Sequence, residues 1–230
     1  MIKLENIDFY YKKTQIFDKF NLEIEKGNIT CLIGENGAGK STLIKLISGL
    51  LYPKRGKLTI DNLEYANSND LIRNKLFATV NEPVFYGHLT VYENLDIFCK
   101  YKGISNNEIE SVLEILNIDG KKKVKELSTG MKQKLSLAYP LLYDYKIIIL
   151  DEPLANIDPF GIELILKLLK KLNEEKGCNI LISTHLLGEF GEFFDEFLVL
   201  KSGKLLFQGK QDSDYPSFKS KLLNVHQGIL

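Results

Sequence analysis

The stretch GENGAGKST, residues 34–42, decides how the chain folds, because three glycines, a lysine and two hydroxyl side chains follow the apolar run ITCLI. It fits the phosphate-loop pattern GxxxxGKS/T. Glycines let the backbone curl until successive N–H groups point inward, and the start of a following helix adds the positive end of its dipole. We therefore expect Lys40 to reach the β- and γ-phosphates of a nucleotide and Ser41 to hold Mg²⁺. The residues expected to cradle the phosphates are Gly34, Asn36, Gly37, Ala38, Gly39, Lys40, Ser41 and Thr42.

The sequence on both sides of this loop supports the same interpretation. Residues 28–34 read as a buried strand, and residues 40–50 have apolar side chains at helical spacing, with Gly49 where a helix would stop. The alternative is a glycine-rich turn before an ordinary helix, which the order strand, loop, helix disfavours. A phosphate loop is shared by kinases, GTPases, motors and transport ATPases, so other residues must specify the function.

The composition weakens several classes of function. The chain has 230 residues, with 30 Lys plus Arg and 30 Asp plus Glu. Its net charge is therefore zero, which gives no support to a nucleic acid or an acidic lipid surface as the main partner. Three scattered cysteines without CxxC spacing indicate a reduced protein without a structural zinc. The first residues lack an apolar signal core, and no run approaches the ~18 apolar residues that span a bilayer. We expect a soluble domain that another polypeptide holds at any membrane.

The remaining chain shows separate strand and helix patterns. Strands are predicted at residues 2–11, 17–27, 56–61, 76–80, 146–150 and 179–184, with a hairpin about Ser202 and Gly203. Helices are predicted at residues 90–103, 105–118, 128–144 and 159–177, the first two opening on Thr90 and Ser105 as N-caps. Pro140 should kink its helix or end it early. The helices between residues 90 and 145 interrupt the alternation and predict a subdomain of their own.

Two adjacent acids, Asp151 and Glu152, follow the apolar run IIIL. A phosphate-loop site needs a carboxylate on a neighbouring strand to hold the metal through its water shell, and we expect Asp151 in that position. Glu152 is then placed to orient or deprotonate a water that attacks the γ-phosphate. Two acids facing solvent at a strand end are the alternative, which the phosphate loop and the apolar run disfavour. Water as the acceptor predicts hydrolysis.

The segment LSTGM, residues 127–131, starts a helix whose exposed N–H groups and dipole end are able to face an anion. With this motif before IIILDEP and after the phosphate loop, the chain resembles the nucleotide-binding domain of ABC transporters over about residues 2–209. Residues 127–131 match the family signature LSGGQ, and LANIDP, residues 154–159, resembles the D-loop. The resemblance implies that Tyr11 stacks on adenine and that His185 contacts the γ-phosphate.

Several of these residues also have ordinary structural interpretations. Tyr11 lies in a strand, where a tyrosine is more often packed than stacked on a ligand. A lone histidine such as His185 is usually structural, Ser128 is able to cap its helix without a ligand, and Asp158 is able to start a turn before Pro159. The position of each residue within the family motifs favours the functional interpretation.

The resemblance implies an α/β fold: a P-loop NTPase core with a mostly parallel central sheet, an N-terminal antiparallel β subdomain and an inserted α-helical subdomain. It assigns residues 1–81 and 146–211 to the core, residues 82–145 to the helical subdomain with the signature, and residues 212–230 to a tail. ATP and Mg²⁺ are the implied ligands. The implied catalytic residues are Glu152, His185 and Lys40, and the implied metal-holding residues are Ser41, Asp151 and Asn81.

One chain is not expected to complete an ATP site. The resemblance implies a head-to-tail dimer of two copies, or of homologous subunits, in which residues 34–42 of one chain meet Ser128 and Gly130 of the other. It also implies a separate transmembrane permease on the cytoplasmic membrane, no nucleic acid, and a docking surface for the permease near residues 81–94, NEPVFYGHLTVYEN.

Three positions depart from the family pattern: Asn81 replaces a glutamine, Thr129 replaces the first signature glycine, and Met131 replaces the signature glutamine. Asparagine is one methylene shorter, so a direct contact with Mg²⁺ becomes water-mediated. A signature of the form LSxGM followed by Lys-Gln resembles those of ATPases that export drugs, peptides or bacteriocins, which favours export.

Two other functions stay open at this point. A non-transport ABC ATPase acting on DNA or ribosomes is disfavoured by the neutral charge and by the short stretch between the phosphate loop and the signature, which lacks sustained heptads. A nucleotide-gated regulatory module with weak turnover is favoured by Asn81 and Thr129 but disfavoured by Glu152 and His185.

Overall fold

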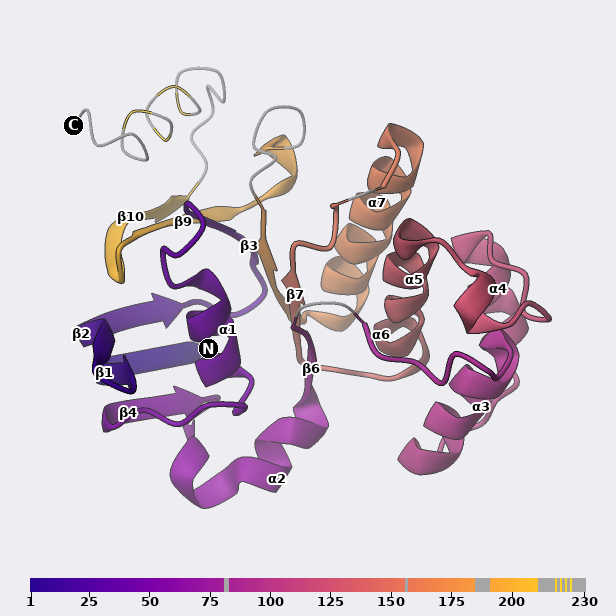
Figure 1. Ribbon diagram of the computed structural model, residues 1–230, viewed down its shortest axis with the longest axis horizontal. Helices are drawn as coiled ribbons and strands as arrows, with labels where there is room; N and C mark the ends of the chain where they lie inside the picture. Colours follow the sequence, from indigo (N-terminus) through magenta and orange to yellow (C-terminus); the bar gives the residue numbers. More distant parts are fainter. Residues whose placement is uncertain are drawn as a thin grey trace.

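The protein is described by a computed structural model that covers residues 1–80, 83–155, 157–184 and 191–210, together with Phe218, Ser220, Leu222 and Asn224. Two sheets and seven α-helices occupy these residues (Figure 1). The smaller sheet is antiparallel and has the order β2-β1-β4-β5. Its strands are β1 (Ile2–Tyr11), β2 (Thr14–Ile24), β4 (Arg55–Ile60) and β5 (Leu63–Glu64).

The larger sheet has the order β10-β9-β3-β8-β7-β6 and is parallel except for β10, which pairs antiparallel with β9. Its strands are β3 (Ile29–Ile33), β6 (Leu76–Thr79), β7 (Ile147–Asp151), β8 (Asn179–Ser183), β9 (Glu196–Lys201) and β10 (Lys204–Lys210). Strands β3, β7 and β8 are apolar and buried along nearly their whole length, as expected for parallel strands covered on both faces. The predicted α/β class with a mostly parallel central sheet and an antiparallel β subdomain is confirmed.

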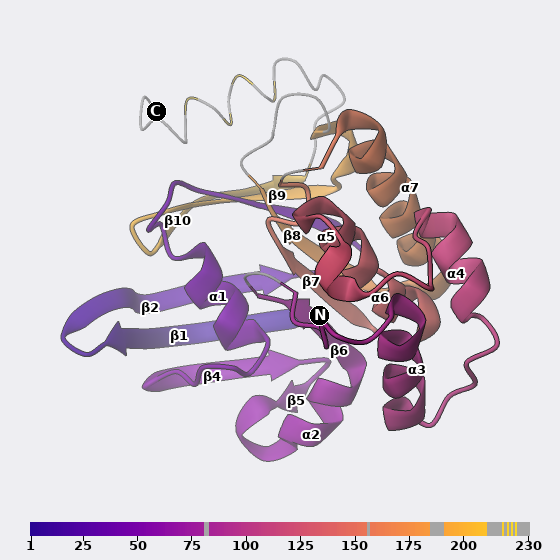
Figure 2. The same cartoon turned by 45° about the vertical axis from the view of Figure 1, so that its right-hand side comes forward.

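The helices are α1 (Lys40–Ile47), α2 (Tyr65–Lys75), α3 (Val91–Lys102), α4 (Ile109–Leu116), α5 (Thr129–Ser136), α6 (Ala138–Leu142) and α7 (Pro159–Lys176). Helices α3, α4, α5 and α6 gather on the side of the molecule away from the smaller sheet in both views (Figures 1 and 2). They form the predicted inserted helical part. The division at residues 81/82, 145/146 and 211/212 stays a prediction, since two of these boundaries fall next to residues outside the description.

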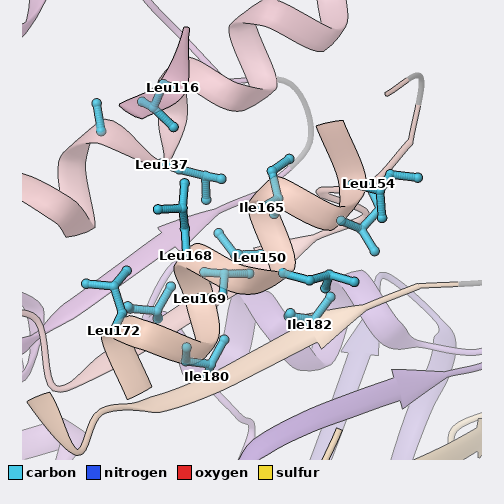
Figure 3. Close-up of a cluster of buried hydrophobic side chains, with 14 of the residues drawn as sticks. Leu116, Leu137, Leu150, Leu154, Ile165, Leu168, Leu169, Leu172, Ile180 and Ile182 are labelled. Carbon is cyan, nitrogen blue, oxygen red and sulfur yellow. The ribbon is translucent and has the colours of Figure 1, made fainter. Parts of the chain in front are cut away.

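The two faces of the larger sheet pack against different partners. Residues of alternate parity in a strand project to opposite faces. Ile147 and Ile149 pack with α1 and the smaller sheet, whereas Ile148 and Leu150 pack with α7 and the helical part. Figure 3 shows the second face, where Leu150 lies against α7. The strands β3, β7 and β8 are thus held between two cores, which fixes the positions of their ends.

Local sequence signals explain most of the helix ends. Thr90 caps α3 in a capping box with Glu93, as predicted for its N-cap. Gly49 adopts a φ of 70° just after α1, a left-handed conformation that suits glycine at a helix end. Pro140 has no N–H to donate to the carbonyl of Ser136, and the predicted break is observed between α5 and α6.

One expectation for the secondary structure was wrong, and one helix was not predicted. Ser105 does not cap α4, which begins at Ile109, because the Ser105 hydroxyl instead accepts from the N–H of Asn107 in the preceding turn. No helix was predicted between residues 62 and 75, where β5 and α2 lie. The α2 sequence buries only Tyr65 and Ile72 and is kinked at Ser68, so its apolar spacing gives little signal.

Candidate functional site

The phosphate loop connects the end of β3 to the start of α1 and depends on its glycines. Gly37 and Gly39 have φ values of 84° and 107°, which L side chains rarely adopt. Gly34 has an ordinary φ, but a β-carbon there would lie 2.5 Å from the carbonyl oxygen of Leu200. Two glycines are therefore needed for the curl of the loop, and the third for its close approach to β9.

Lys40 lies inside the curled loop and is 8% exposed. Its Nζ donates to the carbonyl oxygens of Gly34 at 2.6 Å and Glu35 at 3.3 Å. The N–H of Leu43 donates to the carbonyl of Gly39, so the N–H groups of residues 40–42 lie in the first turn of α1, ahead of the helix's own ladder of bonds. The structure thus brings the lysine and a set of backbone donors to one small region, as the phosphate-loop prediction requires.

Asp151 ends β7 beside the start of α1. The Ser41 hydroxyl donates to Asp151 Oδ2 at 3.0 Å, and the Ser183 hydroxyl donates to Asp151 Oδ1 at 2.6 Å. Hydroxyl and carboxylate oxygens are the ligands that Mg²⁺ prefers, so Ser41 and Asp151 together fit the chemistry of a magnesium site. In the described part of the chain, no group of three or more His, Cys, Asp or Glu side chains is arranged to hold a metal.

Glu152 follows Asp151 in a left-handed backbone conformation with a φ of 49°. Such a conformation is uncommon for a residue other than glycine and is found at turns and functional sites. The N–H of Glu152 donates to two oxygens of Ser183, the hydroxyl at 2.8 Å and the backbone carbonyl at 3.2 Å. The chain therefore turns sharply at Glu152, at the end of the sheet where Ser41 and Asp151 also lie.

The signature segment is remote from the phosphate loop within the chain. Ser128 is exposed, and its hydroxyl accepts from the N–H of Met131 as the N-cap of α5. No hydrogen bond or ion pair between described residues joins residues 127–131 to residues 34–42, and Figure 1 shows α5 and α1 well apart. The structure does not bring Ser128 and Gly130 to the phosphate loop, in agreement with their expected action in trans.

The other predicted residues are placed as follows. Tyr11 ends β1 with a ring that is 42% exposed and packs edge-on against Phe9 at 5.0 Å between centroids. Asp158 caps α7 because its side chain accepts a hydrogen bond from the N–H of Gly161. This bond and the nearby charge of Lys134 lower the pKa of the Asp158 carboxyl. Asn81 and His185 lie outside the described residues.

Sequence reasoning missed Ser183 and the support that the loop receives from β9 and β10. Ser183 contacts both predicted acids, and its signal was its place at the end of an apolar strand next to the metal strand. The N–H of Gly203, in the β9–β10 hairpin, donates to the carbonyl of Ala38 at 2.9 Å. No local pattern in the sequence connects residue 203 with residue 38.

This geometry defines a class of protein. A glycine loop between a buried parallel strand and a helix, an enclosed lysine, and an acid from the next-but-one strand bonded to the loop serine together make a P-loop nucleotide-binding protein. Helix α1 and the acid at the end of β7 lie at the carboxyl ends of the parallel strands, where ligands bind in sheets of this kind.

Comparison with known proteins identifies the family. The family described as ABC transporter matches residues 17–155. The chain is 34% identical over 215 residues to the lantibiotic transport ATP-binding protein SrtF of Streptococcus pyogenes, covering 92% of each protein. It is 35% identical to the bacitracin transport ATP-binding protein BcrA of Enterococcus faecalis over 90% of this chain and 68% of BcrA. It is 37% identical to the ABC transporter ATP-binding protein YcbN of Bacillus subtilis over 85% of this chain and 65% of YcbN, so it spans about two thirds of these two relatives.

Solved structures give the same result. A structure described as the ATP-binding subunit of an ABC transporter has a TM-score of 0.87 and 28% identity, over 99% of both chains. A dimeric post-hydrolysis state of the ATP-binding cassette MJ0796, bound to ADP and Pi, has a TM-score of 0.83 and 28% identity over 93% of this chain and 100% of that one. The chain belongs to the ABC transporter family, as an ATP-binding subunit that hydrolyses ATP to energise transport. No helix in the described residues is both long and apolar enough to cross a membrane.

Proposed function

We propose that this chain binds ATP and Mg²⁺ at residues 34–42, hydrolyses ATP in a head-to-tail dimer, and drives export through a separate transmembrane permease on the cytoplasmic membrane. The observation that carries the proposal is the junction of Ser41 with Asp151 next to the turn at Glu152. These side chains come from α1 and β7, and they meet where the phosphate loop presents its lysine. Binding and hydrolysis are thus assigned to one edge of the larger sheet.

Nucleotide binding uses the loop and its lysine. The phosphates lie against the backbone N–H groups at the start of α1, and Lys40 exchanges its bonds with Gly34 and Glu35 for phosphate oxygens. When bound, Mg²⁺ neutralises the phosphate charge, with Ser41 and Asp151 as the residues that hold it and Asn81 as a further predicted contact. Tyr11 offers an exposed ring for the adenine.

Hydrolysis is assigned to Glu152. A carboxylate one residue beyond the metal acid is positioned to orient a water in line with the γ-phosphate and to accept its proton. His185, which lies outside the described residues, is the predicted γ-phosphate contact. Closing the dimer excludes bulk water, which strengthens these electrostatic interactions.

The dimer is proposed because the signature lies away from the phosphate loop of its own chain. Ser128 and Gly130 stand at the exposed start of α5, where N–H groups and a helix dipole face outward. The dimeric MJ0796 cassettes are structural neighbours of this chain and support the same arrangement. A second copy, or a homologous subunit, then supplies the missing face of each ATP site.

The permease is proposed to dock in an apolar groove of about 480 Å³ between β6, the segment before α3, α3 itself and α6. Val84 is 93% exposed and Tyr101 is 82% exposed at its rim, an unusual exposure for apolar side chains in a soluble domain. Asn94 fixes the wall of the groove, because its amide bonds to the carbonyls of Tyr86 and Thr90. The expected docking stretch, residues 81–94, contributes part of this lining; residues 81 and 82 lie outside the described residues.

Export of an antimicrobial peptide is the proposed transport activity. It is supported by the names of SrtF and BcrA, which describe lantibiotic and bacitracin transport, and by the LSTGMKQ signature. A cargo test is whether cells that carry the chain together with a membrane permease resist bacitracin or a lantibiotic better than cells that carry the permease alone.

Glu152→Gln tests the catalytic assignment. In the assembled transporter we expect turnover to fall by about 10²- to 10⁴-fold, the usual contribution of a general base, while ATP binding is retained. Because ATP then persists, a dimer should accumulate in size-exclusion chromatography with MgATP. Glu152→Gln with the parental hydrolysis rate would show that another residue orients the water. Glu163→Gln, an exposed acid on α7, is the matched control and should behave like the parent.

A further inference from the structure

Ser183 lies at the junction of the two proposed catalytic strands. It is the last residue of β8 and pairs directly with Asp151, the last residue of β7, in the parallel ladder. Directly paired residues of parallel strands project to the same face, and here that face carries Ile149, Leu181 and α1. The side chain of Ser183 has no exposed surface, so its hydroxyl depends on partners within the protein.

The chemistry of the partners fixes the direction of both bonds of this hydroxyl. A carboxylate only accepts and a backbone N–H only donates, so Ser183 donates to Asp151 Oδ1 and accepts from the N–H of Glu152. The first bond is 2.6 Å long, in the range of hydrogen bonds from a hydroxyl to an ionised acceptor. One hydroxyl is thus bonded to both members of the acidic pair.

The two bonds have different consequences. Holding Oδ1 leaves Asp151 Oδ2 directed at Ser41, 3.0 Å away, so the carboxylate keeps one orientation about its terminal torsion. Holding the N–H supports the left-handed turn at Glu152, which is closed on its other side by the N–H of Ala155 donating to the carbonyl of Glu152 at 3.2 Å. An uncommon backbone conformation persists only where the surroundings hold it from several sides.

We propose that Ser183 is a positioning residue for ATP hydrolysis, which sets the metal-holding carboxylate of Asp151 and the backbone of Glu152 relative to each other through one hydroxyl. The proposal rests on the proposed functions of Asp151 and Glu152. An ordinary buried serine needs only one satisfied bond, often to a carbonyl in its own helix. Ser48 is such a case, with its hydroxyl bonded to the carbonyl of Lys45 at the far end of α1.

Four variants separate positioning from simple burial. Ser183→Ala removes the hydroxyl, and Ser183→Cys keeps a side chain of similar shape with a weak donor. Both should lower kcat of the assembled transporter by about 10- to 100-fold, the usual effect of losing a residue that orients a metal ligand. Ser183→Thr keeps the hydroxyl and should retain most of kcat. Ser48→Ala loses a buried serine hydroxyl away from both acids and should keep the parental kcat.

Two measurements on the full-length chain do not depend on turnover. The gain in affinity for a fluorescent ATP analogue on adding Mg²⁺ should shrink in Ser183→Ala and Ser183→Cys but not in Ser183→Thr. Hydrogen exchange at the Glu152 amide should be faster in the first two variants alone. If the parent does not hydrolyse ATP even with its permease, the proposed function is wrong, and these two measurements still report on Ser183.

The proposal is overturned by parental kcat and parental Glu152 amide protection in a folded Ser183→Ala. It is also overturned if Ser183→Thr, folded to the parental thermal midpoint, loses as much kcat as Ser183→Ala, since the hydroxyl is then irrelevant. A fall in kcat that merely follows the unfolded fraction in both Ser183→Ala and Ser48→Ala would show a structural role only.

Discussion

The phosphate loop and the signature segment both present the start of a helix to a proposed anion, but this chain completes only the first. At the phosphate loop, Lys40 closes the ring from inside, Asp151 arrives from β7, and Gly203 supports the loop from the β9–β10 hairpin. At the signature, the Ser128 hydroxyl caps its own helix, and no hydrogen bond from another described segment reaches residues 128–130. A helix start therefore becomes a binding site only when other elements converge on it, and the signature is proposed to be half of a site.

The largest expected effect on nucleotide binding separates these two regions directly. Lys40→Ala should weaken binding of a fluorescent ATP analogue to the isolated chain by about 10- to 100-fold, because a hydrogen-bonding cation is lost. Ser128→Arg should leave this affinity unchanged and instead abolish the ATP-dependent dimer that Glu152→Gln accumulates. The comparison breaks if Ser128→Arg weakens binding to the isolated chain as much as Lys40→Ala does, since the signature would then act within one chain.

A smaller and more selective effect is expected at the docking groove, which belongs to the signature side of the molecule. Ile97→Glu places a charge in the groove and should remove the stimulation of ATPase activity by the permease, while ATP binding to the isolated chain is unchanged. Ile115→Glu on α4 is the matched control, because the two isoleucines are 40% and 45% exposed and only Ile97 lines the groove. If the permease stimulates the ATPase activity of both variants as strongly as that of the parent, the permease docks elsewhere.

The smallest expected effect lies at the outer end of the phosphate-loop side. Tyr11→Ala should weaken ATP binding by about 1 kcal/mol, the lower end of what base stacking contributes, because the ring is already partly packed on Phe9. Tyr11→Phe keeps the ring and should bind ATP as the parent does. The comparison of the two variants separates stacking by the ring from hydrogen bonding by its hydroxyl. If Tyr11→Ala binds ATP with the parental affinity, Tyr11 is a strand residue only.

The sequence predicted the fold where local signals and tertiary packing agree. The apolar runs that became β3, β7 and β8, the capping pair at Thr90, and the break before Pro140 are all readable from neighbouring residues. Helix α2 was missed because its short polar sequence is held by packing of Tyr65 and Ile72 that no period reveals. Ser105 misled because a serine hydroxyl serves a turn as readily as a helix start.

The site was predicted less completely, for a related reason. Motif positions identified Lys40, Ser41 and Asp151, and the structure brings these three together. Ser183 was missed because its importance comes from register: the parallel ladder sets residue 183 beside residue 151, and a linear pattern does not encode which strands are neighbours. The roles of Lys40, Ser41 and Asp151 stay predictions, as do those of the other proposed site residues, Tyr11, Asn81, Ser128, Gly130, Glu152 and His185.

The bonds of Lys40 to Gly34 and Glu35 have a consequence for which ligands the phosphate loop selects. The ammonium group of Lys40 donates to two carbonyl oxygens of its own loop, so these dipoles partly satisfy its charge within the protein. An incoming ligand must outcompete those dipoles, which a highly charged triphosphate does and a single weak acceptor does not. The internal bonds of Lys40 thereby favour a highly charged ligand over a weakly charged one.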